Sequence, residues 1–110
     1  VVGPESIEEA KRYARFVDML ILDTVAESIY GIGSAGTVHD WSISRRIVDE
    51  VPIPVILAGG LTVENVADAV RAVRPWGVDS LTHTNKFLPD GKRVKDMDKV
   101  IAFCKAAREA

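Results

Sequence analysis

Short, almost wholly apolar runs alternate with amphipathic stretches along this chain. The apolar runs are Val17–Leu22, Val55–Ala58 and Gly77–Leu81. Around them, apolar residues recur every three or four positions, which is the period of a helix with one buried face. These helical stretches are Glu5–Arg15, Ser42–Val51 with Asp40 or Ser42 as its cap, the segment that Thr62 caps and Pro75 ends, and Asp96–Arg108. A polar, basic loop that runs from Lys86 to Lys95 precedes the last of them. Strands this apolar are typical of a parallel sheet covered by crossover helices, so the alternation predicts one α/β domain over residues 1–110 with four βα units.

Two α/β architectures satisfy this alternation. One is half of a (βα)8 TIM-type barrel, with this chain covering roughly strands five to eight. The alternative is a small open, flavodoxin-like parallel sheet. The chain opens on Val1-Val2-Gly3-Pro4, which has the composition of a strand end and the turn after it. We therefore expect a half barrel that forms the C-terminal piece of a longer protein.

Composition limits the partners that this chain can have. Its 110 residues carry a formal net charge of -2, which argues against nucleic acid or an anionic membrane as the main partner. The single cysteine, Cys104, excludes an internal disulfide, and no apolar run approaches the roughly 18 residues that span a bilayer. We expect a cytoplasmic protein. Because Cys104 falls on the apolar stripe of the last predicted helix, we expect it to be a buried structural residue.

A carboxylate and several glycines follow the predicted strands. Asp23 ends the first apolar run, and a loop of small residues that includes Gly36 comes after it. Parallel α/β proteins place their sites at the carboxyl ends of strands, so Asp23 is a candidate acid, although capping a turn would also account for it. Gly59 and Gly60 end the next strand, where backbone without a Cβ can approach an anion and the following helix points its positive end. This pair favours a phosphate site over a plain turn.

Several segments of the chain, taken in order, resemble the C-terminal half of phosphoribosylanthranilate isomerase or a close paralogue. These segments are Leu20–Thr24, Gly33–Gly36 with Asp40-Trp41, Pro54–Leu61, Glu64–Val66, Arg74–Asp79 and Lys95-Asp96. Each segment alone is a weak signal, but their order and spacing together are specific. The resemblance implies a (βα)8 barrel whose whole is an aldose–ketose isomerase of tryptophan biosynthesis. It also implies an Amadori rearrangement of a sugar phosphate that needs no cofactor and no metal.

The resemblance assigns catalytic roles as well. In the family a general acid opens the ribose ring from the end of strand six, and Asp23 matches that position. The general base is a cysteine at the end of strand one, a strand that this chain does not contain. Cys104 cannot replace that base by position. We therefore expect the isolated chain to be inactive.

The family holds the substrate phosphate in the loops after strands seven and eight. Gly59 and Gly60 fit the first of these loops, and Gly36 belongs to the substrate-binding loop after strand six. The second loop departs from the family, because it lacks the glycine of the usual Ser-Ser-Gly run. There, Thr82 and His83 are candidates to bind an anion through their side chains instead.

Alternatives to this isomerase remain open. The altered loop after the last strand, together with Ser34-Ala35-Gly36 where the family favours Gly-Thr-Gly, fits a paralogue acting on or binding another sugar phosphate. A half barrel also leaves two open sheet edges, which predicts either self-association as a non-catalytic module or pairing with an N-terminal half barrel. His39 is interpreted as a packing or capping residue. Neither it nor His83 has metal-ligand spacing with a cysteine or carboxylate cluster.

Overall fold

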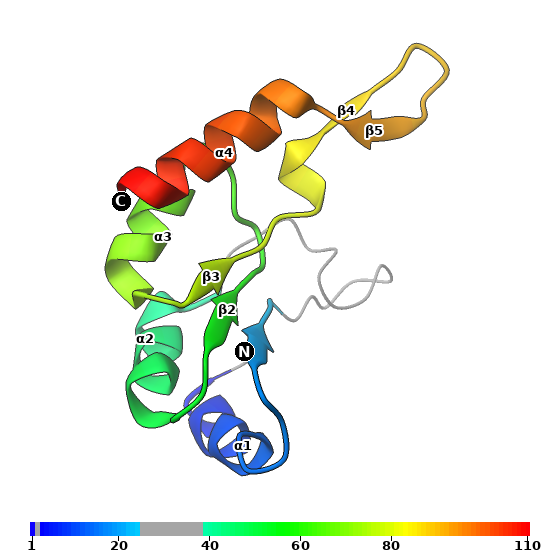
Figure 1. The fold of residues 1–110 in the computed structure, drawn as a ribbon. Coiled ribbons are helices and arrows are strands. Elements are labelled where there is room, and N and C mark those ends of the chain that lie inside the picture. The colour runs from blue at the N-terminus through cyan, green and yellow to red at the C-terminus, as the bar shows by residue number, and fades with distance from the viewer. Residues whose placement is uncertain (2, 25–38) are drawn as a thin grey trace.

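The computed structural model describes residues 1, 3–24 and 39–110 (Figure 1). Its main sheet contains β1 (Leu20–Leu22), β2 (Val55–Leu57) and β3 (Gly77–Val78), which run parallel in the order β1-β2-β3. Ile21 is in register with Ile56 across the first pair of strands. The predicted α/β class with a parallel sheet is therefore confirmed.

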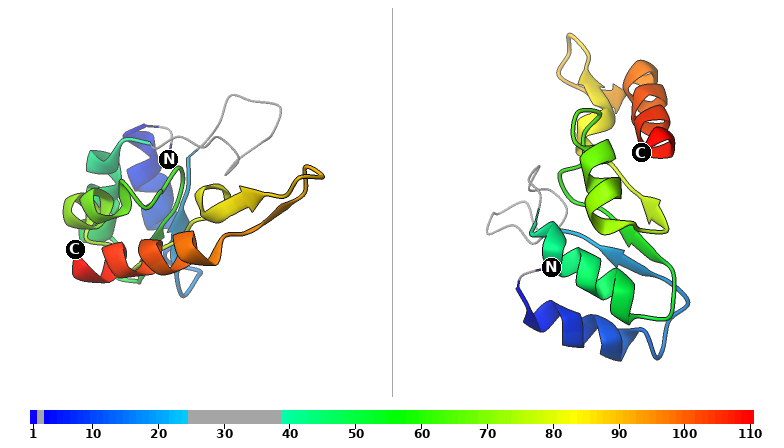
Figure 2. Two further views of the ribbon diagram at one scale, coloured as in Figure 1. Left: turned by 90° about the horizontal axis from the view of Figure 1, so that it is seen from above. Right: turned by 90° about the vertical axis from the view of Figure 1, so that its left-hand side faces the viewer.

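Four helices of the described residues lie on one side of this sheet. They are α1 (Glu5–Tyr13), α2 (Trp41–Glu50), α3 (Val66–Val73) and α4 (Met97–Glu109), and each packs against the next (Figures 1 and 2). All four contribute to a single core, whose buried members are Ile7, Ala10, Leu22, Ile47, Val51, Val55, Leu57, Leu61, Val66, Ala69, Val73 and Phe103. Strands in sequential order with helices on the same side make this a singly wound sheet.

The opposite face of the sheet is exposed. Ile21 is 57% exposed, whereas its neighbours Leu20 and Leu22 are half-buried and buried. A flavodoxin-like sheet carries helices on both faces, so that alternative does not match the described residues. The predicted strand Val17–Leu22 is also too long, because β1 begins at Leu20 and residues 17–19 are exposed. Burial on both faces was a wrong expectation for β1, since a single layer of helices covers the sheet.

Aspartates cap two of the helices. Asp40 precedes α2, and its Oδ1 accepts a hydrogen bond from the backbone N–H of Ser42 at 2.9 Å. Asp96 precedes α4 and accepts from the N–H groups of Asp98 and Lys99. Such caps satisfy first-turn N–H groups that have no partner within the helix. The predicted starts, Ser42 and Asp96, each lie one residue from the observed starts, Trp41 and Met97.

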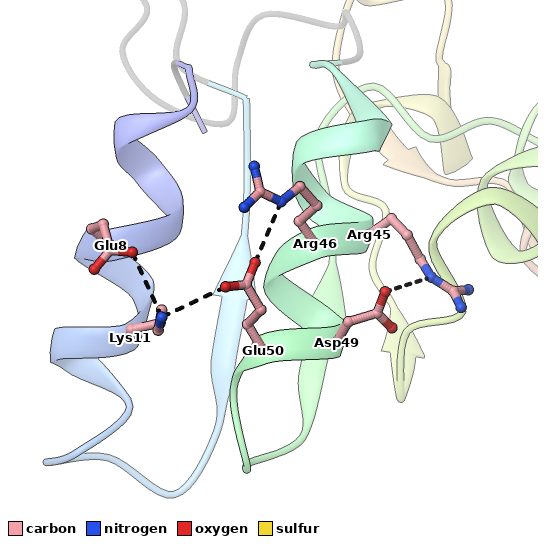
Figure 3. A network of polar contacts seen from close by, with 6 residues as sticks. All are labelled: Glu8, Lys11, Arg45, Arg46, Asp49 and Glu50. Atoms are coloured by element: carbon pink, nitrogen blue, oxygen red, sulfur yellow. Dashed lines mark hydrogen bonds and ion pairs between the residues drawn. The ribbon is translucent and has the colours of Figure 1, made fainter.

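Ion pairs join α1 to α2 at the surface (Figure 3). Lys11 Nζ lies 3.5 Å from Glu50 Oε1, and Glu50 Oε2 lies 3.4 Å from Arg46 Nε. Lys11 Nζ is also 3.6 Å from Glu8 Oε1. Exposed pairs of this kind are worth about 0.2–1 kcal/mol each. They supplement the apolar contacts between the two helices and do not replace them.

Residues 85–95 form an antiparallel hairpin where the sequence predicted a polar, basic loop. Its strands are β4 (Asn85–Phe87) and β5 (Arg93–Lys95), and a short 3₁₀ helix, η1 (Thr82–Thr84), precedes them. The turn contains Pro89-Asp90-Gly91, with Gly91 at φ +85°. Pro-Asp-Gly is a turn signal that favours a hairpin between two short strands. The signal was present in the sequence, but the charged residues around it suggested a loop.

The predicted apolar stripe of α4 is only partly right: Val100 and Ala107 are half-buried, but the rest of the stripe is exposed. Phe103 is buried, whereas Met97 and Ile101 are 62% and 61% exposed, and Cys104 is exposed. The helix carries two overlapping apolar faces, and only the one with Phe103 contacts the core. The expected burial of Cys104 is therefore wrong.

Replacing Phe103 with Ala should lower the free energy of unfolding by about 3–5 kcal/mol, because it leaves a cavity in the core. Ile101→Ala, on the exposed face of the same helix, is the matched control and should change that free energy by less than about 0.5 kcal/mol. Urea titration followed by circular dichroism measures both. A loss in Ile101→Ala as large as that in Phe103→Ala would contradict the packing of α4 through the Phe103 face alone.

Candidate functional site

Asp23 and Gly59 meet at the carboxyl ends of β1 and β2. Asp23 directly follows β1, and Gly59 follows β2 with φ +94°. A Cβ placed on Gly59 would lie 3.0 Å from Asp23 Oδ1 and 2.7 Å from Thr24 N, and would overlap Thr24 Oγ1. Both the positive φ and the close approach therefore require glycine at position 59. Two of the predicted site residues are adjacent in the structure.

The carboxylate of Asp23 is held in a defined orientation. The backbone N–H of Thr24 donates to Asp23 Oδ1 at 2.7 Å, and the Val1 ammonium donates to the Asp23 carbonyl at 2.7 Å. Asp23 is half-buried beside buried Thr24. The hydrogen bond from the neighbouring backbone restrains the carboxyl group at the end of the strand.

His39 lies between two buried hydroxyls. Its Nδ1 is 3.0 Å from Thr24 Oγ1, and its Nε2 is 2.5 Å from Ser44 Oγ. Thr24 and Ser44 are 7% and 0% exposed. A neutral imidazole offers one donor and one acceptor, and a hydroxyl can serve either as donor or as acceptor, so both ring nitrogens are satisfied without a charge.

The electrostatics of His39 agree with a neutral ring. Burial and, second to it, the nearby Val1 ammonium lower the pKa of His39 to about 4, although Asp23 and Asp40 act in the opposite direction. The pKa of Asp40 is itself held below its usual value by hydrogen bonds from the side chain and backbone of Ser42. At neutral pH the ring therefore connects the strand end to α2 through hydrogen bonds alone.

Sequence reasoning missed this role of His39, which was interpreted as a packing or capping residue. A signal was available in α2, where Ser44 occupies a position that points into the core. A buried hydroxyl needs a hydrogen-bond partner. The nearby histidine was a candidate for that partner.

The glycine pair after β2 is part of an ordered loop. Gly60 has φ +68°, and its carbonyl accepts a hydrogen bond from Asn65 Nδ2 at 3.0 Å. Thr62 and Asn65 then cap each other: Thr62 N–H donates to Asn65 Oδ1 at 2.7 Å, and Asn65 N–H donates to Thr62 Oγ1 at 3.1 Å. This reciprocal pair is a capping box, so Thr62 starts the turn that leads into α3 as predicted, although regular helix begins at Val66.

Thr82 and His83 lie after β3, apart from Asp23 and Gly59. Both belong to η1 and line a cleft of about 510 Å³ between η1, the start of the α3 turn and the hairpin. The cleft is lined by Thr62, Val63, Glu64, Thr82, His83, Asn85, Lys86, Phe87 and Lys99. Ser80 Oγ donates to Leu61 O at 3.0 Å and ties the two loops together. Thus the structure pairs Asp23 with Gly59 and Thr82 with His83, whereas Gly36 lies outside the described residues.

The described part of the chain contains no cluster of three His, Cys, Asp or Glu side chains that could hold a metal ion. Cys104 lies on the exposed face of α4, and a cleft there is lined by residues of that helix only. Among the same described residues, no helix has the length and apolar character needed to cross a membrane.

Protonation of His39 should make stability depend on pH between about 6.5 and 4. In that window the unfolded chain takes up a proton that the folded chain excludes, so the free energy of unfolding should fall as the pH falls. His39→Gln should remove this part of the pH dependence, and His83→Gln serves as the control that keeps it. Urea titrations at several pH values in this window measure the slope, and an unchanged slope in His39→Gln would contradict the assignment.

Comparison with known proteins identifies a family for the whole chain. The sequence model of the family described as N-(5'phosphoribosyl)anthranilate (PRA) isomerase matches residues 1–106. The chain is 50% identical over 108 residues to N-(5'-phosphoribosyl)anthranilate isomerase 2 of Methanosarcina mazei, an alignment that covers 98% of this chain and 46% of that protein. The chain thus spans about half the length of the curated relatives that it matches.

Solved structures agree with the sequence relatives. The crystal structure of phosphoribosylanthranilate isomerase from Thermotoga maritima superposes with a TM-score of 0.75 at 35% identity, and the match covers 100% of this chain and 49% of that one. A phosphoribosylanthranilate isomerase in complex with reduced 1-(o-carboxyphenylamino)-1-deoxyribulose 5-phosphate gives a TM-score of 0.71 at 31% identity, covering 100% of this chain and 46% of that one. The resemblance read from the sequence motifs is confirmed. The chain belongs to the N-(5'-phosphoribosyl)anthranilate isomerase family.

Proposed function

We propose that this chain is the C-terminal half of a phosphoribosylanthranilate isomerase barrel, a single half-barrel domain over residues 1–110. The observation that carries the proposal is the contact between Asp23 and Gly59 at the carboxyl ends of adjacent parallel strands. In a (βα)8 barrel this end of the strands carries the active site. The whole enzyme would convert an aminoaldose phosphate into an aminoketose phosphate in tryptophan biosynthesis.

The half-barrel arrangement is supported by the way the sheet is covered. Helices lie on one side, the strand order is sequential, and Ile21 is exposed on the face that would point into a barrel. Val1 hydrogen-bonds to Asp23 O, as the end of a preceding parallel strand would. A groove of about 250 Å³ also lies along β1. Its lining consists of residues of β1 and α1 together with Val1 and Ile47. In this proposal β1, β2 and β3 are the sixth, seventh and eighth strands of the barrel.

Asp23 is the proposed general acid. It would donate a proton to the ribose ring oxygen as the bond from that oxygen to C1 breaks and the nitrogen on C1 forms an imine. The Thr24 N–H holds one carboxyl oxygen, which leaves the other to carry the transferred proton. A base must then remove the proton from C2, and we assign that base to the other half of the barrel. Cys104 is unsuited to this role, because it lies on the outer face of α4.

The loops after β2 and β3 are the proposed phosphate site. Gly59 and Gly60 both have positive φ. Asp23 and Thr24 occupy the space of the missing Cβ at Gly59, so Gly60 is the residue of the pair whose backbone an anion would approach. Thr82 and His83 belong to the loop after β3, which Ser80 ties to Leu61 directly after the glycine pair, and they line a cleft that does not include Gly59 or Gly60. Backbone N–H groups and hydroxyls at such a junction can bind a phosphate.

A second candidate is a paralogous enzyme for another sugar phosphate, and it is favoured by one observation. The loop after β3 forms η1 with His83 inside it and contains no glycine. A histidine there adds a side chain close to the proposed phosphate and narrows the space for the substrate. For either candidate function, the sheet has open edges, so we expect this chain to pair with an N-terminal half barrel or with a second copy of itself.

Asp23→Asn should reduce kcat by about 10²–10⁴-fold, because the amide cannot donate a proton as an acid does. The assay uses this chain fused to the N-terminal half of the Methanosarcina mazei relative, with phosphoribosylanthranilate as substrate. Asp18→Asn is the matched control, since Asp18 is exposed and precedes β1, whereas Asp23 follows it. The fused enzyme should keep its activity in that control.

Two results would count against the proposal in different ways. Full activity of Asp23→Asn would exclude Asp23 as the acid. A fused enzyme that fails to rescue a tryptophan auxotroph lacking the isomerase, yet folds, would favour the paralogue with another substrate.

A further inference from the structure

Lys95 reaches from the hairpin to the loop that follows β3. Its Nζ donates to Leu81 O at 2.7 Å and to Thr84 Oγ1 at 2.7 Å. The Thr84 hydroxyl, which is buried, donates in turn to Leu81 O at 3.4 Å. An ammonium group has three N–H donors and can satisfy both acceptors at once. A single side chain therefore fixes the residue before η1 and the residue that ends it.

The contact with Leu81 O has a consequence for the next amide. Leu81 and Thr82 share one trans peptide unit, in which the carbonyl and the N–H point in opposite directions. With the carbonyl turned towards Lys95, the Thr82 N–H is directed away from the hairpin. A charged donor on the carbonyl also polarises the peptide and strengthens its N–H as a donor.

We propose that Lys95 is a positioning residue for the phosphate site, which acts by presenting the Thr82 N–H to the anion. The inference rests on the proposed function, in which the loop containing Thr82 binds the substrate phosphate. That loop has no glycine to give its backbone conformational freedom. Lys95, which lies outside the loop, restricts the conformation of the loop backbone through its hydrogen bond to the Leu81 carbonyl.

Other contacts hold the same segment and should keep it folded without Lys95. The backbone N–H of Asp96 donates to Thr84 O at 2.9 Å, and Lys99 Nζ donates to Asn85 O at 3.0 Å. The hairpin itself is paired over β4 and β5. Removing the Lys95 ammonium should therefore leave the Leu81 carbonyl with only the 3.4 Å contact from the Thr84 hydroxyl, while the hairpin and α4 remain in place.

Titration of the ¹⁵N-labelled chain with inorganic phosphate tests the inference directly. In the parent chain the Thr82 amide signal should shift with phosphate concentration. Lys95→Met should weaken this binding about tenfold, since a hydrogen bond from a charged donor is lost. Lys92→Met removes a charge from the same hairpin without touching η1 and should leave the affinity unchanged. Lys95→Arg, which keeps the charge and the donors, should restore part of it.

The outcomes separate this inference from the proposed function. Parental affinity in Lys95→Met overturns the role of Lys95 and leaves the phosphate site standing. A Thr82 amide that ignores phosphate in the parent chain overturns the phosphate site itself. If phosphate binding weakens equally in Lys92→Met and Lys95→Met, the effect comes from the lost charge alone, which would overturn the positioning role of Lys95. In the fused enzyme, Lys95→Met should raise KM about tenfold and leave kcat nearly unchanged, whereas a loss of kcat with constant KM contradicts positioning of the phosphate.

Discussion

One-sided packing of four helices against a three-stranded parallel sheet is the constraint on which this structure depends. Parallel strands that share one layer of helices all end at the same edge, so the residues after each strand are brought together there. Asp23 and Gly59 meet for this reason, and the loop after β3 joins them through the contact of Ser80 with Leu61. The same packing leaves Ile21 exposed on the other face of the sheet.

Two features of the strand ends determine what chemistry is possible. Gly59 brings the backbone of one loop against Asp23 and Thr24, which no residue with a Cβ could do in that conformation. His39, held neutral by burial, joins Thr24 to α2 through hydroxyls. Asp23 therefore lies beside a segment that backbone and neutral hydrogen bonds hold in place, which would suit the proton transfer that we propose for its carboxyl group.

Much of the fold could be predicted from local sequence signals. Asp40, one of the two caps expected for α2, does cap that helix, and α4 begins one residue after its predicted start at Asp96, because helix starts depend on neighbouring residues. The outward face of α4 could not be predicted, because Phe103 and Ile101 are equally apolar and only tertiary contacts decide which one is buried. The same holds for Cys104, whose exposure follows from that choice.

The candidate site was predictable where it follows from topology. The approach of Asp23 to Gly59 follows from the carboxyl ends of neighbouring parallel strands. The chain from Thr24 through His39 to Ser44 was not predicted, because it joins residues from three segments through side chains whose partners have no fixed sequence spacing. The position of Thr82 in a separate cleft likewise depends on η1 and the hairpin, which the sequence reading treated as a loop.

The most direct test of the half-barrel proposal is to assay this chain and the N-terminal half of the Methanosarcina mazei relative separately and as a mixture, with phosphoribosylanthranilate as substrate. Because the acid and the base are assigned to different halves, neither half alone should turn over the substrate, and their mixture should. Turnover by this 110-residue chain alone would contradict the account, since it would mean that the chain contains its own base.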